Sequence, residues 1–229
     1  MHEWDVSPAE AVAIQQRLRP LVSLAPSFRL DELRTVAGVD AAYGAVGRAA
    51  VVVLTFPGLE VVEQAVAERE SVFPYVPGLL SFREAPGVLA AIALLQSQPD
   101  LFIFDGQGIA HMRGLGLASH LGLVLDKPSI GCAKSKLVGQ YREPGPQQGD
   151  STPLTYRGRV VGTVLRPASG RKALLFVSPG HRIGVESAAR IVRECLRGRI
   201  MPEPTRLAHE LVTAARREVE VADRLINDS

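Results

Sequence analysis

Three strand-like runs follow one another with only short turns between them, and this pattern limits the chain to a few sheet topologies. The runs are TVAGVDAAYG from Thr35, AAVVVLTF from Ala49 and EVVEQAVAE from Glu60, and Gly and Pro mark the turns between them. Connections this short favour antiparallel neighbours. The sequence therefore predicts an antiparallel meander as the first part of a sheet.

The next part of the chain alternates between helical and strand-like segments. A helical region after PYVPG, broken at Pro86, precedes the short strand LFIFDG, and the helical GLGLASHLGLVL precedes the strand SIGCAKS. Such alternation is typical of parallel strands joined by helices. We therefore expect a parallel continuation of the sheet, and an α/β fold in which helices flank a mixed sheet.

The ends of the chain add helices, and the segment before the last two helices adds further strand-like runs. Ser7 and Glu10 form a capping-box pattern with Pro8 at the first helical position, so a first helix should run toward Arg19. A loop of sequence YREPGPQQGDSTP is followed by the strand-like runs LTYRGRVVGTVL and ALLFVSPG. Helical GVESAARIVRECLRG, with Gly198 as its stop, and helical TRLAHELVTAARREVEVADRLI complete the chain.

Length and composition indicate one domain over residues 1–229. With 229 residues, 46% of them hydrophobic, the chain can bury a large core. The longest apolar run, Val88–Leu95, is far shorter than the roughly 20 residues of a membrane span, and the amino terminus lacks the pattern of a signal peptide. We therefore expect a soluble, cytoplasmic monomer that makes no contact with a membrane.

Neither the net charge nor the cysteine content indicates a function. The formal net charge of +2, from 26 basic and 24 acidic residues, does not by itself indicate a nucleic-acid ligand. The excess of arginine over lysine, 22 to 4, suits phosphate binding, but coding bias explains it equally well. Cys132 and Cys195 are too few for a four-cysteine zinc site, so we interpret both as core thiols.

Three acidic residues lie within or beside apolar segments. Asp40 interrupts an apolar strand, Asp105 closes the strand LFIFDG, and Glu84 lies in the helical region between them. Two carboxylates a few ångströms apart repel by roughly 4 kcal/mol at an effective dielectric of 20, and a hard divalent cation removes this penalty. Ligation by carboxylates alone favours Mg²⁺ or Mn²⁺ over zinc. Each acid taken alone could equally be a structural residue bonded to backbone donors.

The run DGQGIAHMRG places a possible ligand site beside one of these acids. Gly106 and Gly108 allow a ligand to approach the backbone just past a strand end, where α/β sheets place their ligands. A dinucleotide site is the competing interpretation, but GQGIAH lacks the G-x-G-x-x-G spacing. The spacing thus favours a ligand other than a dinucleotide.

Six ordered motifs, taken together, resemble one known family. They are VAGVDAAY, PYVPGLLSFREAP, DGQGIAHMRGLGLASHLG, GCAKSKL, SPGHRIG and PEPTRLAHEL, and the sequence is similar to endonuclease V from about Thr35 to Leu211. The resemblance implies a ribonuclease H-like fold with a central mixed five-stranded sheet, three antiparallel strands followed by two parallel ones. It also implies a repair nuclease that uses Mg²⁺ or Mn²⁺ on DNA containing deaminated purines such as hypoxanthine. The implied cut is at the second phosphodiester bond 3′ to the lesion, leaving 3′-hydroxyl and 5′-phosphate ends.

The same resemblance assigns catalytic roles to five residues. Asp40 and Asp105 are the implied direct metal ligands, and Glu84 completes the acidic cluster. Lys134 is implied to lie near the scissile phosphate, and His209 at the edge of the active site. Outside this context, Lys134 and the neighbouring Lys136 would be ordinary exposed cations, and His209 would cap a helical carbonyl.

The resemblance also explains the rigid sequence PYVP as a wedge. Tyr75 would fill the gap left when the damaged base rotates out, and Pro74 and Pro77 would stiffen the loop. The alternative is a surface tyrosine packed on its own prolines. The implied base pocket consists of residues that present mainly backbone groups: Gly78, Leu80, Gly106, Gly108 and His111.

Three other functions compete with the repair nuclease. A protein of this fold could bind deaminated bases without cutting, but the retention of all three acids argues against this. An endoribonuclease acting on inosine-containing RNA would be distinguished by a contact to the ribose 2′-hydroxyl. A resolvase or a nuclease for RNA–DNA hybrids is disfavoured by the wedge and pocket motifs.

Overall fold

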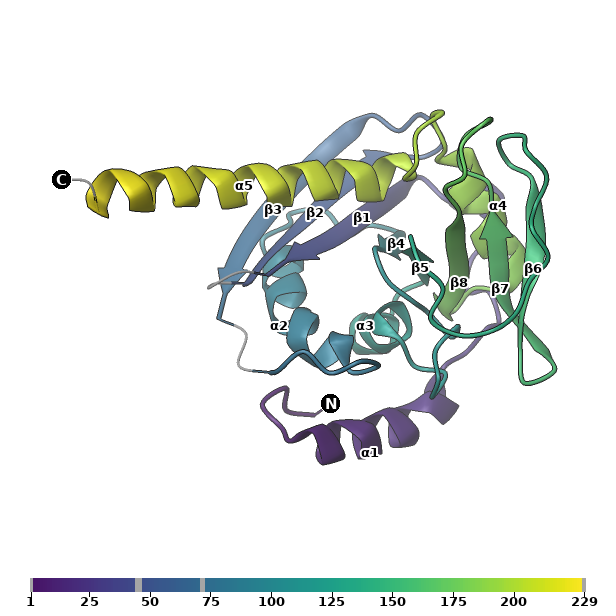
Figure 1. The fold of residues 1–229 in the computed structure, drawn as a ribbon, viewed down its shortest axis with the longest axis horizontal. Helices are drawn as coiled ribbons and strands as arrows, with labels where there is room; N and C mark the ends of the chain where they lie inside the picture. The colour runs from purple at the N-terminus through teal and green to yellow at the C-terminus, as the bar shows by residue number, and fades with distance from the viewer. Residues whose placement is uncertain (1, 44–46, 71–72, 228–229) are drawn as a thin grey trace.

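An eight-stranded mixed sheet forms the centre of the computed structural model, which describes residues 2–43, 47–70 and 73–227 (Figure 1). Its strand order is β3-β2-β1-β4-β5-β8-β7-β6. The strands are β1 (Thr35–Ala42), β2 (Gly47–Thr55), β3 (Val61–Arg69), β4 (Leu101–Phe104), β5 (Ser129–Ala133), β6 (Ser151–Tyr156), β7 (Arg159–Leu165) and β8 (Leu175–His181).

The first five strands have the predicted arrangement. β1, β2 and β3 form an antiparallel meander, and β4 and β5 continue the sheet from β1 in parallel. Gly44, the last residue of the first predicted run, lies outside the described residues. Because β1, β4 and β5 are parallel, their carboxyl ends meet at the same edge of the sheet.

The predicted number of five strands is wrong, because the sheet does not end at β5. β8 pairs with β5 antiparallel, and β7 and β6 follow it outward. The run LTYRGRVVGTVL forms two strands because Arg157 and Gly158 both have positive φ, of 50° and 73°, and turn the chain back on itself. Two successive residues with positive φ suit the tight turn of a β-hairpin.

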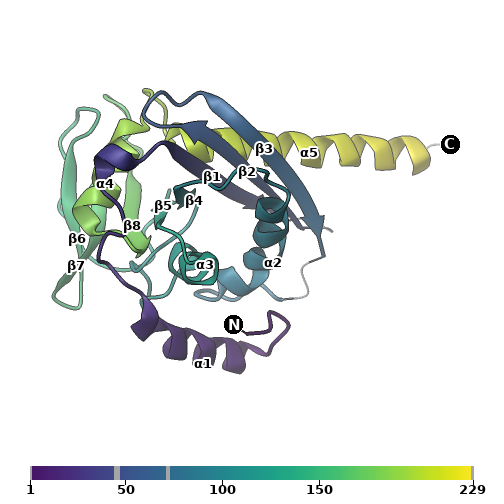
Figure 2. The same cartoon turned by 180° about the vertical axis from the view of Figure 1, so that it is seen from behind.

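Helices cover both faces of the sheet (Figures 1 and 2). On one face, α4 and the start of α5 pack on side chains such as Val36 and Ile103, and on the other α2 and α3 pack on side chains such as Phe102 and Phe104. Successive strand residues point to opposite faces, so both faces of β4 are apolar. The helices are α1 (Pro8–Leu18), α2 (Leu80–Ala93), α3 (Leu117–Leu125), α4 (Val185–Glu194) and α5 (Glu203–Asn227), with 3₁₀ turns η1 (Arg19–Leu21) and η2 (Leu30–Glu32).

The amino-terminal helix α1 begins with the predicted capping box. Ser7 Oγ accepts from the amide of Glu10, and the Glu10 carboxylate accepts from the amide of Ser7. The buried face of α1 packs against Phe73, Leu79 and Phe82, around the start of α2. This contact ties the first helix to the segment that precedes α2.

Two predicted helix boundaries are wrong. α2 continues through Pro86 instead of breaking there. An interior proline costs about 3 kcal/mol, but the apolar face of α2, including Val88 and Ala91, packs on the sheet and offsets this cost. α4 ends at Glu194, before the predicted stop at Gly198, which instead adopts a positive φ of 69° in the turn that follows.

Both cysteines are free and buried, as predicted, and burial raises the pKa of each thiol. They lie in the core between the sheet and the helices α4 and α5. Among the described residues, no helix combines the length and the apolar character needed to cross a membrane.

Candidate active site

Three predicted site residues lie at the carboxyl ends of the parallel strands. Asp40 is near the end of β1, Asp105 directly follows β4, and Lys134 directly follows β5. Ligands of open α/β sheets bind outside such strand ends. The topology therefore brings together residues that are up to 94 positions apart in the sequence, from 40 to 134.

Asp40 is paired with a histidine from the last helix. His209 Nδ1 donates to Asp40 Oδ2 at 2.7 Å, and the Asp40 side chain is 9% exposed. This contact requires close approach of α5 to β1, which Gly38 permits: a Cβ there would lie 2.0 Å from the backbone of Pro204. Gly38 and Asp40 share one face of β1, while Thr205 and His209 share one face of α5.

Asp105 is paired with Lys134, whose Nζ lies 2.6 Å from Asp105 Oδ2. Burial alone would lower the pKa of Lys134, but the hydrogen bond and the attraction to Asp105 outweigh it, and the pKa is raised. Lys134 therefore stays cationic, and its side chain remains about half exposed, at 46%. It places a fixed positive charge at the rim of the site.

Glu84 approaches the two aspartates from α2 and is almost completely buried. Burial, followed by repulsion from Asp40 and Asp105, raises its pKa well above the ordinary value. Burial and repulsion from Asp105 likewise raise the pKa of Asp40. Glu84 and Asp40 thus lie close enough to other carboxylates for their ionised forms to be disfavoured, as like charges in a shared site do.

These acids suit a hard cation by their chemistry, but their side chains are not arranged around one point. Across the described ranges, no three His, Cys, Asp or Glu side chains are grouped so that they could hold a metal ion. Asp105 is engaged by Lys134 and Asp40 by His209. The three carboxylates nevertheless offer only oxygen donors, which are the donors that Mg²⁺ and Mn²⁺ prefer.

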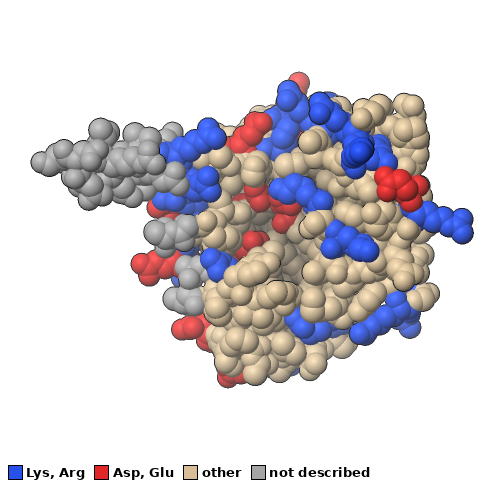
Figure 3. All heavy atoms as spheres, in the orientation of Figure 1, with Lys and Arg blue, Asp and Glu red and all other residues tan. Residues whose placement is uncertain are grey.

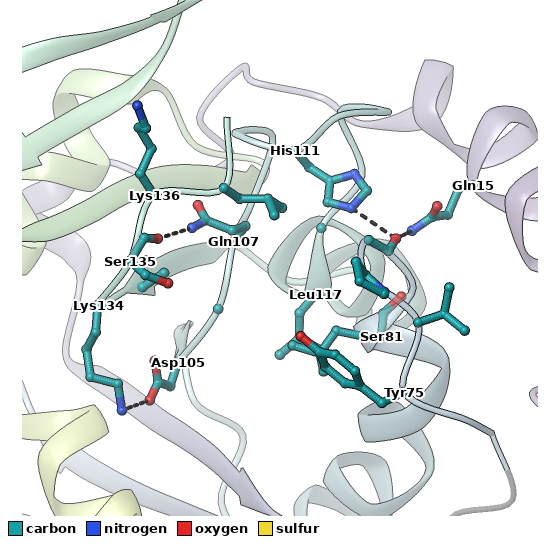
Figure 4. Close-up of a pocket in the computed structure, with 18 residues that line it drawn as sticks. Gln15, Tyr75, Ser81, Asp105, Gln107, His111, Leu117, Lys134, Ser135 and Lys136 are labelled. Atoms are coloured by element: carbon teal, nitrogen blue, oxygen red, sulfur yellow. Dashed lines mark hydrogen bonds and ion pairs between the residues drawn. The ribbon is translucent and has the colours of Figure 1, made fainter. Parts of the chain in front are cut away.

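A cavity of about 300 Å³ adjoins the acids, within the size range of small-ligand sites. Asp105 and Lys134 form one side of it, and Tyr75, His111 and Gln15 lie on the opposite side (Figure 4). The cavity is lined by Tyr75 and Pro77 of the predicted wedge and by four residues of the predicted base pocket, Gly78, Leu80, Gly106 and His111.

Two predicted substrate-binding residues, Pro74 of the wedge and Gly108 of the base pocket, do not line this cavity. The amide of Gly108 donates to Ser178 Oγ at 2.8 Å, and its carbonyl accepts from the amide of Gly116 at 2.9 Å. A Cβ at Gly108 would lie 2.1 Å from Pro179 O. Gly108 therefore joins the loop after β4 to β8 and is not open to the cavity.

The cavity also contains polar residues that the motifs did not single out. Gln107 donates from Nε2 to the backbone oxygen of Ser135 at 2.9 Å, and its buried Oε1 has no hydrogen-bond partner. Lys136 lines the cavity too, and its Nζ lies 5.7 Å from the centre of the Tyr141 ring. Gln15 comes from α1. In the sequence, the one indication that Gln15 is buried is its position on the same helix face as Ala11, Ile14 and Leu18.

Charged side chains surround the site on the molecular surface. On the face seen in Figure 3, acidic side chains lie near the middle, and lysine and arginine side chains lie around them. Phosphate backbones are attracted to basic surfaces, and grouped carboxylates favour a hard cation. This distribution suits a strand of nucleic acid passing over an acidic centre.

A sequence model of the family described as Endonuclease V matches residues 16–210. The chain belongs to the endonuclease V family. It is 51% identical over 214 residues to an Endonuclease V of Roseiflexus sp., covering 93% of this chain and 95% of the relative. It is 47% identical over 216 residues to that of Nostoc punctiforme, covering 93% and 97%. The chain is therefore an endonuclease, which hydrolyses phosphodiester bonds.

Solved structures of endonuclease V have the same fold. The crystal structure from Streptomyces avermitilis has a TM-score of 0.88 at 42% identity and covers 95% of this chain and 96% of its own. That of Ciona intestinalis endonuclease V has a TM-score of 0.82 at 26% identity and covers 92% and 98%. The Ciona protein is in complex with a 24mer DNA containing an inosine followed by a ribo-adenosine.

Proposed function

We propose that this endonuclease repairs DNA by recognising hypoxanthine and cutting the second phosphodiester bond on its 3′ side, leaving 3′-hydroxyl and 5′-phosphate ends. The observation that carries the proposal is that Asp105 and Lys134 line the same cavity as Tyr75. When a base is held in this cavity, the strand to which it belongs lies beside the acidic cluster. The inosine in the DNA bound by the Ciona relative supports this choice of base.

Tyr75 is the wedge in this proposal. Its side chain is 68% exposed although it is a large aromatic residue, and it lies at the cavity on the segment before α2. A base leaves the stack at a cost of a few kcal/mol, which is smaller for a mispaired base. The Tyr75 ring can stack in the gap and recover part of that cost.

A divalent cation, Mg²⁺ with Mn²⁺ as a substitute, would be held by Asp40, Asp105 and Glu84. When bound, such a cation activates water and neutralises charge on the phosphate and on the leaving oxygen. Lys134 adds a positive charge beside the phosphate. His209 donates to Asp40 through Nδ1, so the neutral ring keeps a lone pair on Nε2 that can accept a proton from water.

We assign the fold to the ribonuclease H-like class on the arrangement of its first five strands. Three antiparallel strands are followed by two parallel ones, in the order β3-β2-β1-β4-β5. Asp40 and Asp105 lie where two of the parallel strands end. β8, β7 and β6 then extend this unit on the side of β5.

The test is cleavage of end-labelled oligonucleotides that differ at one base. We expect the protein to nick inosine-containing duplex DNA at the second bond 3′ to inosine with Mg²⁺ or Mn²⁺, and not with a chelator. A duplex with adenosine at that position is the control. Equal cutting of both duplexes, or cutting that survives chelation, would contradict the proposal. Faster cutting of a matched inosine-containing RNA would identify the chain as an endoribonuclease.

Replacing Tyr75 with alanine should weaken the binding of inosine-containing duplex by about 5- to 150-fold, because base–aromatic stacking contributes about 1–3 kcal/mol. Tyr75→Phe, which keeps the ring, should bind nearly as the native protein does. Equilibrium binding with a fluorescent duplex, at a metal concentration too low for cleavage, measures both. Unchanged affinity in the alanine variant would rule out the wedge.

A further inference from the structure

One backbone oxygen beside the cavity accepts three side-chain hydrogen bonds. The carbonyl of Gly78 accepts from Gln15 Nε2 at 3.0 Å, from His111 Nε2 at 3.0 Å and from Arg113 Nη2 at 2.6 Å. Figure 4 shows Gln15 and His111 pointing to this oxygen from different sides. A carbonyl has two lone pairs, so this oxygen has no capacity left for a base.

The three donors are themselves fixed by further hydrogen bonds. Gln15 is 1% exposed, and its Nε2 also donates to Leu115 O at 3.1 Å, while its Oε1 accepts from Arg113 Nε. His111 Nδ1 accepts from the amide of Arg113 at 3.2 Å, so the ring is neutral with its proton on Nε2. Burial, aided by Arg113, lowers the pKa of His111 to about 4 and keeps it in this form at neutral pH.

This hydrogen-bonded group joins three segments that are distant in the sequence. Gln15 belongs to α1, and His111 and Arg113 belong to the loop between β4 and α3. Gly78 lies three residues after Tyr75 and adopts a φ of +80°. A Cβ on Gly78 would lie 2.8 Å from Arg113 Nη2 and from Met112 Sδ. Side chains therefore fix the Tyr75 segment against the rest of the cavity.

We propose that Gln15 is a positioning residue for base recognition, which holds the Gly78 carbonyl so that the Tyr75–Gly78 segment and the cavity are set before DNA binds. The proposal rests on the function proposed above for this cavity. An amide is the one side-chain group that can donate to two carbonyls while accepting from a guanidinium. A segment fixed in advance loses less entropy when it engages the strand.

The expected consequence is a loss of recognition without a matching loss of chemistry. Gln15→Met keeps the length of the side chain but removes both donors and the acceptor, and Gln15→Glu keeps only the acceptor for Arg113. Both variants should raise KM for inosine-containing duplex by about tenfold, because hydrogen bonds that order the site before binding are lost. The rate constant kcat, which depends on the acids across the cavity, should fall much less.

Gln16→Met is the matched control, because Gln16 is the next residue of α1 and is exposed. It should retain the native KM and kcat. Arg113→Met is a second test that leaves the buried face of α1 intact, and it removes one donor to Gly78 and the donor to Gln15. It should raise KM in the same way. If the Gln15 variants do not fold, the KM of Arg113→Met tests whether these hydrogen bonds support recognition.

Steady-state cleavage of inosine-containing duplex and of its adenosine control, well below the melting temperature of each variant, separates the possible results. A raised KM with a reduced preference for inosine in the folded variants supports the inference. A native KM in these variants, or a fall in kcat alone, overturns it. Absence of any preference for inosine in the native protein would instead refute the function proposed for the cavity.

Discussion

Asp40→Asn is expected to lower the rate of strand cleavage by about a thousandfold or more while leaving the affinity for inosine-containing DNA unchanged. Asparagine keeps the shape of Asp40 but not its negative charge, so its neutral carbonyl oxygen binds a divalent cation beside Asp105 and Glu84 much more weakly than the carboxylate. The several kcal/mol of charge stabilisation that a bound metal provides correspond to a rate effect of this size. Single-turnover cleavage with saturating protein and Mg²⁺ measures it.

The same substitution should raise the stability of the metal-free protein near pH 7. Burial and Asp105 raise the pKa of Asp40 in the folded state. An acid with a raised folded pKa favours the folded state below its unfolded pKa of about 4 and progressively loses this contribution as the pH rises through the folded pKa. The ionised carboxylate is therefore a net cost at neutral pH, and asparagine removes it.

Asp31→Asn provides the matched control for the cleavage assay. Asp31 is an aspartate whose side chain is 66% exposed, and it pairs with the exposed Arg29. This variant should cleave at the native rate. A tenfold fall in rate corresponds to an increase of about 1.4 kcal/mol in the activation free energy. If Asp40→Asn retained more than about a tenth of the native rate, Asp40 would have no central role in the chemistry.

Gly38→Ala is expected to destabilise the fold by about 3 kcal/mol or more. The new methyl group would lie 2.0 Å from the carbonyl carbon and oxygen of Pro204 and 2.6 Å from the amide nitrogen of Thr205. These are backbone atoms, so no side-chain rotation can relieve the clash, and α5 must move away from β1. That movement would also separate His209 from Asp40, so both melting temperature and cleavage rate should fall.

Gly87→Ala is the control for this prediction. Gly87 lies inside α2, and a Cβ there would be 3.7 Å from the Cβ of Ala49, an ordinary contact. Alanine should stabilise the helix by about 0.5–1 kcal/mol. Thermal unfolding followed by circular dichroism should show opposite shifts, with a decrease of about 6–12 °C for Gly38→Ala. A small change in the melting temperature of Gly38→Ala would show that α5 moves away from β1 without loss of stability.

The hydrophobic patterns predicted the parts of the fold that depend on local signals. Short turns between the first three runs predicted the meander, and the alternation that followed predicted the parallel strands β4 and β5. The division of LTYRGRVVGTVL into two strands was missed because Arg157 supplied no turn signal: arginine rarely takes a positive φ. The continuity of α2 through Pro86 was missed because packing on the sheet decides it, and packing is not a local property.

The site was predictable where its residues stand at strand ends. Asp40 and Asp105 could be placed together once the parallel strands were recognised, whereas Lys134 was assigned by the family resemblance. The role of Gly108 was not predictable, because its backbone contacts Ser178 and Pro179, which are 70 and 71 residues away in the sequence. Gln15 was missed for a similar reason: a buried glutamine on an amphipathic helix gives no indication of which carbonyls it contacts.

The pairing of Asp40 with His209 spans 169 of the 229 residues. Contacts between residues so far apart form late, because the loop that they close carries a large entropic cost until the intervening elements have assembled. A partly folded chain in which α5 has not yet docked on β1 therefore holds the carboxylate without its histidine. In the proposed mechanism, the chain therefore becomes competent as a nuclease only after α5 has docked on β1.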